Sequence, residues 1–237
     1  MSQERTRQLT GILLILGAVL VNIPYTLLIM NFDYPDILRF PAGEILQRFA
    51  AGGPSLVWTW LAFAWVGLFI LGGILLLPKA MDDKTPAGKV ALFFGATGAV
   101  VQIIGLLRWP FVVSILAQMF TSPLSTEATR AAAVVVFQAV NQYGGVVLGE
   151  HIGQLFTILW MVVLSLSLLA GKRFPRWFSI TGLAAALVYA LAQGDLLATA
   201  IPGFPVWGAA GLAGSLLWLA WLLILGILVL RSAKVAR

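Results

Sequence analysis

The sequence predicts an all-α integral membrane protein, folded as a bundle of six transmembrane helices. Of its 237 residues, 60% are hydrophobic and only 10% are charged, whereas soluble domains are about 25% charged. Apolar runs of roughly 20 residues, long enough to cross ~30 Å of hydrocarbon as a helix, occur six times. An unpaired backbone amide in lipid costs several kcal/mol, so such runs must be helical.

The six runs are expected to form one polytopic domain over residues 1–237, because the loops between them are too short to hold a soluble domain. Two further apolar segments, FVVSILAQMF (111–120) and AAAVVVFQAV (131–140), are too short to cross alone. We expect them to extend the third and fourth helices past the bilayer or to lie along its surface. The predicted spans are residues 9–30, 55–78, 88–109, 145–170, 177–199 and 206–230.

The first apolar run follows Arg5 and Arg7 and is about twenty residues long. A secretory signal peptide has an apolar core of roughly 7–15 residues followed by a small-residue cleavage site. The run fits neither feature, so we interpret it as a retained first membrane helix. The expected location is the cell (cytoplasmic or inner) membrane.

The distribution of basic residues predicts the orientation. Eleven of the fifteen Lys and Arg residues fall in the N-terminal segment, the loops after the second and fourth helices, and the C-terminal tail. Only Arg39, Arg48 and Arg130 fall on the other side. Cytoplasmic loops of membrane proteins are enriched in Lys and Arg, so both termini are predicted to be cytoplasmic.

Composition also excludes several classes of site. The chain has no cysteine and one histidine, which excludes disulfides, thiol catalysis and zinc sites built on thiolates or several imidazoles. No metal and no cofactor are expected; a bis-histidine haem would need His151 from two chains. The net charge is +6, but the basic residues lie in short clusters between apolar runs. The expected partner is therefore the lipid bilayer and not a nucleic acid.

Charged residues of three predicted helices fall at one level on the outer side. Arg108 lies near the outer end of the third helix, Glu150 and His151 in the first turns of the fourth, and Asp195 near the outer end of the fifth. A charge at mid-bilayer costs ~2.5–3.5 kcal/mol, so we expect Arg108 to pair with Glu150 or Asp195. The pairing is either a structural lock or part of a pocket. The candidate ligand-binding residues are Arg108, Glu150, His151, Asp195, Gln154 and Asn22.

Three glycines at a spacing of four, Gly145, Gly149 and Gly153, line one face of the fourth helix. Small residues at this spacing let another helix approach closely, so the face is a candidate for helix packing, including packing with a partner protein. In an α-helix Glu150 projects ~100° from Gly149 and His151 ~200° from it. The two neighbours are therefore expected to do different jobs and not to form an acid–base dyad.

The polar segment before the second helix has a pattern of its own. After Pro41, the spacing of Ile45, Leu46 and Phe49 is typical of a short amphipathic helix, which would lie on the outer face and cap the polar cluster. The alternative is a solvated connection anchored by its aromatic residues. Pro110 is expected to bend or end the third helix.

Three segments carry a resemblance to a known family: RQLTGILLILGAV, FQAVNQYGGVVLGEHIGQLFTILW and GKRFPRWFSITGLAAALVYAL. With them the chain resembles a bacterial family of six-helix integral membrane proteins, the domain of unknown function 4386 family. The resemblance implies a six-helix bundle and no particular activity. Members of that family often have a histidine in the second segment, where this chain has Gln138, Asn141 and Gln142.

Three classes of function fit these residues. The first, which we prefer, is binding or transport of a small molecule or ion through the outer polar cluster. The second is a membrane enzyme acting on a lipid or isoprenoid, with Glu150 or Asp195 as general acid or base and Arg108 holding an anionic head group. The third is a non-catalytic subunit, sensor or assembly factor that binds a partner helix through the glycine face.

Overall fold

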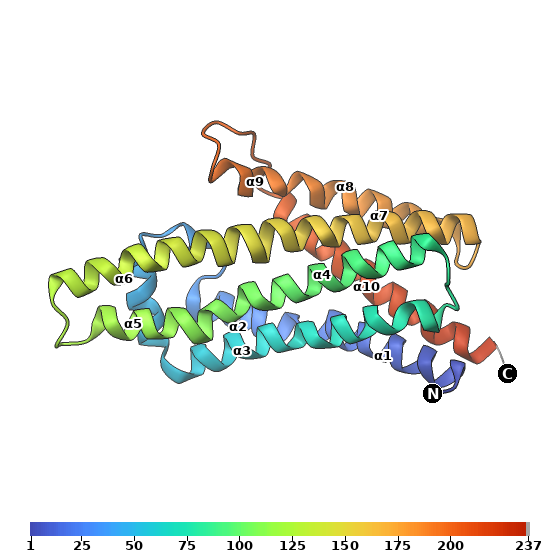
Figure 1. Ribbon diagram of the computed structural model, residues 1–237, viewed down its shortest axis with the longest axis horizontal. Helices are drawn as coiled ribbons and strands as arrows, with labels where there is room; N and C mark the ends of the chain where they lie inside the picture. The colour runs from blue at the N-terminus through green and yellow to red at the C-terminus, as the bar shows by residue number, and fades with distance from the viewer. Residues whose placement is uncertain (236–237) are drawn as a thin grey trace.

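The prediction of an all-helical chain with six long apolar helices is confirmed. The computed structural model describes residues 1–235, and this part of the chain contains helices and connecting loops but no strand (Figure 1). Six helical stretches are long and apolar enough to cross a membrane, as a multi-pass membrane protein requires. They are Gln3–Phe32, Ala42–Ala80, Pro86–Thr121, Glu127–Gly171, Arg176–Ala198 and Ala210–Ser232.

Several of these stretches combine more than one helical element. Most of the elements are α-helices, η1 is a 3₁₀ turn, and η2 and η3 are π-helical. The elements are α1 (Gln3–Leu20), α2 (Asn22–Phe32), η1 (Asp36–Arg39), α3 (Ala42–Ala80), α4 (Pro86–Arg108), η2 (Trp109–Val113), α5 (Ser114–Thr121), α6 (Glu127–Val140), η3 (Asn141–Ile152), α7 (Gly153–Gly171), α8 (Arg176–Leu191), α9 (Gln193–Ala198) and α10 (Ala210–Val235).

The bundle is elongated and its two ends differ. The N-terminus and the last described turn of α10 lie at one end, which we call the terminal end (Figure 1). The turn between α5 and α6 forms the opposite tip, which we call the hairpin end. The six spanning helices form a closed ring in which each packs against two others, in the order α1, α3, α4, α7, α8, α10 and back to α1.

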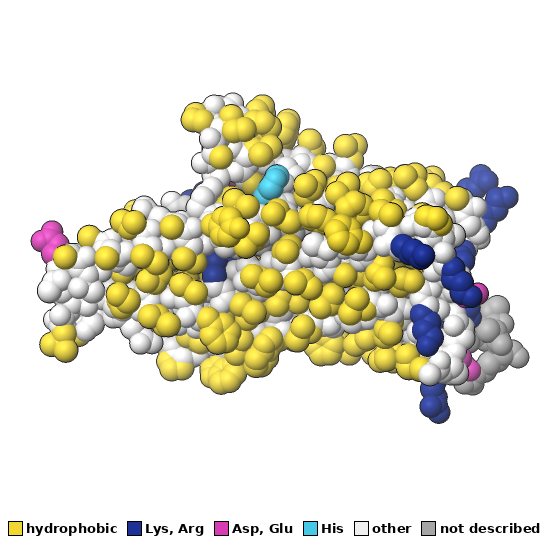
Figure 2. All heavy atoms as spheres, viewed as in Figure 1, with side chains coloured by type: hydrophobic (Ala, Val, Ile, Leu, Met, Phe, Trp, Pro, Cys, Tyr) yellow, Lys and Arg dark blue, Asp and Glu magenta, His cyan; other side chains and the backbone are white. Residues whose placement is uncertain are grey.

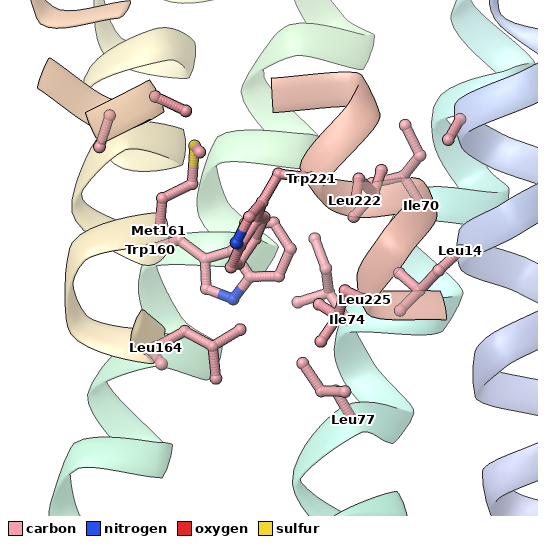
Figure 3. Close-up of a cluster of buried hydrophobic side chains, with 14 of the residues drawn as sticks. Leu14, Ile70, Ile74, Leu77, Trp160, Met161, Leu164, Trp221, Leu222 and Leu225 are labelled. Atoms are coloured by element: carbon pink, nitrogen blue, oxygen red, sulfur yellow. The ribbon is translucent and has the colours of Figure 1, made fainter. Parts of the chain in front are cut away.

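Two separate hydrophobic cores fill the bundle. The core of the terminal half is built from α1, α3, α4, α7, α8 and α10, with Trp160 facing Trp221 at 5.6 Å between ring centroids (Figure 3). The core of the hairpin half is built around Trp60 and Trp109, whose rings stack at 4.6 Å. Between the two cores lies a layer of polar side chains, which is where the candidate site is found.

The two short apolar segments extend the third and fourth spanning helices, which settles the alternative left open by the sequence. Pro110 was predicted to bend or to end the third spanning helix. It does not end the helix, because the chain stays helical from Pro86 to Thr121. Proline clashes with the preceding turn of an α-helix and lacks an N–H. The wider π-helical winding of η2 accommodates it, and the carbonyl of Pro110 accepts a 2.6 Å hydrogen bond from Ser114 Oγ.

The segment after Pro41 is helical, and Ile45, Leu46 and Phe49 are all buried. It is separated from the rest of α3 at Gly53, whose backbone leaves the helical region with φ 57° and ψ −154°. Residues with a side chain rarely adopt a positive φ, so glycine permits the break. The following Pro54 then suits the first turn of the second part. The short helix thereby turns across the hairpin end and packs against α5 (Figure 1).

A very close approach between two spanning elements joins α4 to η3. A Cβ added to Gly105 would lie 2.5 Å from the Cα of Gly149, so the two backbones touch with no side chain between them. Such contact is available only to small residues. It fixes the spacing of α4 and η3 at the level of the polar layer.

We predict that Gly105→Ala destabilises the protein by about 1–3 kcal/mol, the usual cost of overpacking a tight interface. The added methyl group would push against the backbone of Gly149, which cannot rotate away. Thermal unfolding of the detergent-purified protein measures the effect. The matched control is Gly211→Ala in α10, where a Cβ would meet nothing within 4 Å; equal melting temperatures for the two variants would contradict the prediction.

Candidate functional site

Arg108, the last residue of α4, is the centre of the polar layer. Its side chain is 8% exposed. Nη1 donates a 2.7 Å hydrogen bond to the carbonyl of Gly105, and Nη2 donates a 3.1 Å bond to Oδ1 of Asn141. The guanidinium lies 5.1 Å from the ring centroid of Trp109 and against the backbone of Gly145. Its Nε is buried and has no partner in the described part of the chain.

The expected ion pair of Arg108 is not formed. Glu150 lies near enough to interact electrostatically with Arg108, but no ion pair or hydrogen bond joins their side chains. Asp195 pairs instead with Arg39, whose Nη2 lies 2.7 Å and 2.6 Å from the two carboxylate oxygens. Arg108 instead directs two of its five N–H donors to the carbonyl of Gly105 and to Asn141.

Glu150 is consequently a carboxylate without a direct partner. It makes no hydrogen bond or ion pair with any residue that the structure describes. Besides Arg108, it interacts electrostatically with Asp195 and Arg39. The Arg39–Asp195 pair is half-exposed and joins η1 to α9, so it forms a rim beside the buried layer.

His151 points away from Glu150 and belongs to a separate hydrogen-bonded chain. Its Nδ1 lies 2.6 Å from Oε1 of Gln193, and Nε2 of Gln193 donates a 2.9 Å bond to Oε1 of Gln154. These two hydrogen bonds hold α9 against η3 and α7. The adjacent residues Glu150 and His151 therefore serve different contacts.

Asn22 does not join the other candidate residues. Its side-chain amide donates to the carbonyls of Ala18 and Val19 on its own helical stretch, at 2.9 and 3.2 Å. This is local capping of the junction between α1 and α2. The remaining sequence-based candidates lie on η3, α7, α9 and the end of α4, at one level of the bundle.

The glycine face of the fourth span is covered by α4 of the same chain. Gly149 packs on Gly105, Gly145 lies under the guanidinium of Arg108, and Gly153 lies against the side chain of Gln102. The close approach that the spacing predicts is thus made within the chain. The surface is already used, and a second chain would have to displace α4 to reach it.

The π-helical winding of η3 explains how Glu150 reaches the interior. In a π-helix, residue i bonds to residue i+5, so five residues cover a little more than one turn. In an α-helix, with 3.6 residues per turn, five residues go well past it. Glu150 follows Gly145 by five positions and is therefore turned toward the side on which Gly145 meets α4. Long π segments are rare and are often found at functional sites.

Sequence reasoning missed four residues of this layer. Tyr34, in the loop after α2, and Tyr189, on α8, both interact electrostatically with Glu150. Burial raises the pKa of the Tyr34 phenol, and the charge of Glu150 raises it further, so this phenol stays neutral. Asn141 binds Arg108, and Gln102 donates to the carbonyl of Gly153 and to Thr157 Oγ1 at 3.0 and 2.9 Å. Gln102 could have been found from the sequence, because it is a lone amide side chain within an apolar run.

Comparison with known proteins identifies a family but no activity. The family model described as a domain of unknown function, DUF4386, matches residues 9–226. This range includes every residue of the polar layer. No curated protein and no solved structure matches the chain.

We predict that Asn141→Ala lowers stability by about 1–3 kcal/mol, because Asn141 is the only side-chain acceptor of the buried Arg108 guanidinium among the described residues. The comparison is Gln142→Ala, which removes an exposed 3.0 Å bond to Thr199 Oγ1 and is expected to change stability by less than about 0.5 kcal/mol. Thermal unfolding in the same detergent distinguishes the two. Similar losses in both variants would argue against a special role for the contact between Asn141 and Arg108.

Proposed function

The chain belongs to the DUF4386 family, and from its geometry we propose that it binds a small polar molecule or ion at the layer around Arg108 and Glu150. The family name assigns no activity, so the proposal rests on the residues themselves. The observation that supports it most is the presence of two opposite charges that do not pair, one on the buried Arg108 and one on the partly buried Glu150.

An unpaired charge inside a membrane helix bundle is expensive. Ionisable residues within spans cost ~2.5–3.5 kcal/mol at mid-bilayer and mark ligand or ion pathways by default. A purely structural use of Arg108 and Glu150 would join them directly, because breaking a buried pair leaves an uncompensated charge. Here Arg108 binds Asn141 and Glu150 binds nothing described. A guest that contacts Glu150 would supply the missing partner.

The distribution of Lys and Arg side chains over the surface supports a particular depth for the polar layer in the membrane. Most of the Lys and Arg side chains seen on the face in Figure 2 gather at the terminal end. About 20 helical residues cross the hydrocarbon. Counted from Lys89 along α4, and from Gly171 backward along α7, that length ends near Arg108 and His151. The layer would then lie close to the interface opposite the basic end.

This placement gives the direction of access. With the basic end cytoplasmic, in the bacterial inner membrane that the resemblance implies, the layer would face the outside, and the extensions α5 and α6 would project beyond the lipid. The short helix Ala42–Gly52 would then lie at the outer interface. The binding site would therefore be reached from the outer side of the cell membrane.

The terminal half favours binding over conduction. Its core contains large apolar side chains, among them Trp160, Trp221 and Phe178, with Phe178 stacked on Trp221 at 5.1 Å. The cavity between α3, α4 and α7 in this half has a volume of about 10 Å³, roughly the space of one water molecule. A guest at Glu150 would therefore find no open path through the terminal half of the bundle.

The orientation predicts a labelling pattern. In intact cells, a membrane-impermeant maleimide should label Leu124→Cys at the hairpin tip, where the native side chain is 94% exposed. It should not label Lys84→Cys, in the loop between α3 and α4, until the cells are opened. The absence of native cysteine makes each signal specific. The reverse pattern would overturn the proposed orientation.

The binding proposal predicts a ligand-dependent gain in stability that requires Glu150. A panel of small cations, anions, zwitterions and neutral polar molecules is screened by thermal unfolding of the protein in nanodiscs. A ligand at one hundred times its Kd raises stability by about 2.7 kcal/mol. We expect at least one class to shift the melting temperature of the wild type and of Glu127→Gln, at the exposed start of α6, but not of Glu150→Gln.

Glu127→Gln removes the same charge from a surface site and is the matched control. If no class shifts the melting temperature, or if every shift survives both Glu150→Gln and Arg108→Gln, the proposed function is wrong.

A further inference from the structure

The six-residue helix α9 is attached to the rest of the bundle mainly through polar side chains. It packs against η3 and α8. Gln193, at its start, lies 2.6 Å from His151 and donates a 2.9 Å hydrogen bond to Gln154. At its other end, Thr199 Oγ1 accepts a 3.0 Å bond from Nε2 of Gln142. Helix α9 therefore lies along η3, from the level of His151 to that of Gln142.

Little apolar surface holds α9 in place. Its buried residues are Gly194 and Leu196. The loop that follows folds back on the same helix, because a Cβ added to Gly194 would meet the carbonyl oxygen of Pro205 and the ring of Trp207. Helix α9 and this loop form one unit at the side of the bundle, residues 193–209, which we call the flap (Figure 1). Segments with few buried apolar contacts open at low free-energy cost.

One ion pair connects the flap to the opposite side of the hairpin half. Arg39, in η1, directs Nη2 to both carboxylate oxygens of Asp195, at 2.7 and 2.6 Å. No extensive packing joins α9 to η1 or to α2 in the described part of the chain. The two side chains are 61% and 45% exposed, so the pair can separate without leaving a buried charge uncompensated.

The η1 side of this ion pair is firmly packed beside the polar layer. Ile37 of η1 is fully buried, and Tyr34, just before η1, meets the ring of Trp60 edge-on at 5.2 Å between centroids. Trp60 in turn stacks on Trp109 at 4.6 Å, and the guanidinium of Arg108 lies 5.1 Å from the centroid of Trp109. The ion pair thus joins a fixed side of the polar layer to the loosely packed flap.

We propose that the pair of Arg39 and Asp195 is a latch that holds the flap closed on η3, beside Glu150. When the pair separates, the flap moves away about the junction of α8 and α9 at Ala192, and water replaces its hydrogen bonds to η3. A guest then reaches the polar layer from the outer side. The latch regulates access to the proposed site, so it rests on the proposed function. Lids of this kind admit a ligand and then exclude water around it.

The opening of the flap is measured with a thiol placed under it. The chain has no native cysteine, so Leu196→Cys, at an 8% exposed position of α9, supplies the only thiol. The full chain is placed in nanodiscs, and the rate of its reaction with the neutral reagent N-ethylmaleimide is measured. Leu124→Cys, at the 94% exposed hairpin tip, gives the rate of an open thiol. We expect the thiol at position 196 to react at least about tenfold more slowly.

Removal of the latch should raise the rate at position 196. An exposed ion pair shifts an equilibrium by about two- to fivefold, so Arg39→Gln and Asp195→Asn should each speed the reaction by about that factor. The double variant should react no faster than the faster single one, because both remove the same interaction. About 1 M salt, which screens exposed charges, should speed the reaction in the chain with the intact pair and not in Arg39→Gln.

The matched control is Glu44→Gln. It breaks another half-exposed ion pair, in which Oε1 of Glu44 lies 2.8 Å from Nη2 of Arg48 within the short helix after Pro41. It should leave the rate at position 196 unchanged. An unchanged rate in either Arg39→Gln or Asp195→Asn, or an equal increase in Glu44→Gln, would overturn the latch. Equal rates at positions 196 and 124 in the chain with the intact pair would overturn it as well.

The latch and the proposed function fail separately. The ligand panel tests binding through Glu150 and does not depend on the labelling. A guest that the panel finds should slow the labelling at position 196, because a guest held under the flap favours the closed state. If it does not, the regulatory role is wrong and the proposed function stands. If the panel finds no guest, the regulatory role falls with the proposed function, even where the ion pair holds the flap closed.

Discussion

The contact on which the rest of the structure depends is the meeting of two backbones at Gly105 and Gly149. Because no side chain separates them, α4 and η3 lie close enough for Arg108 to reach Asn141 and for Gln102 to reach the carbonyl of Gly153. Each of these bonds crosses from one helix to the other. In a bilayer, where lipid competes with apolar side chains for the same surfaces, close backbone packing and interhelical hydrogen bonds provide the association that a hydrophobic effect cannot.

The sequence alone predicts the six helices and the level of the polar layer. Both depend on quantities that accumulate along a chain, namely the length of apolar runs and a constant rise per residue. The same counting placed Arg108, Glu150, His151 and Asp195 at one level, where the structure also has them. The extension of two helices into the α5–α6 hairpin left no comparable signal, because its apolar segments were short enough to suit a surface helix equally well.

The partners within the layer could not be predicted in this way. Which acceptor a guanidinium finds depends on helix rotation, and η3 does not rotate as an α-helix does. Sequence reasoning therefore assigned Arg108 to a carboxylate, although an asparagine nine residues before Glu150 is the group that faces it. Tyr34 comes from a loop and Tyr189 from an aromatic-rich helix, where neither stands out from residues that only pack. Such contributions become visible only when distant segments are assembled.

The π-helical winding also makes the layer sensitive to chain length as well as to residue identity. A π turn contains one more residue than an α turn of the same chain. η3 is 12 residues long, more than two π turns, so the loss of one residue does not convert it into an ordinary α-helix. A deletion that the winding does not absorb turns the residues on either side by about 100° relative to each other, even where it removes no member of the polar layer. Among relatives of this chain, insertions and deletions within this one segment would thus separate proteins that retain the layer from proteins that keep its residues but have lost their arrangement.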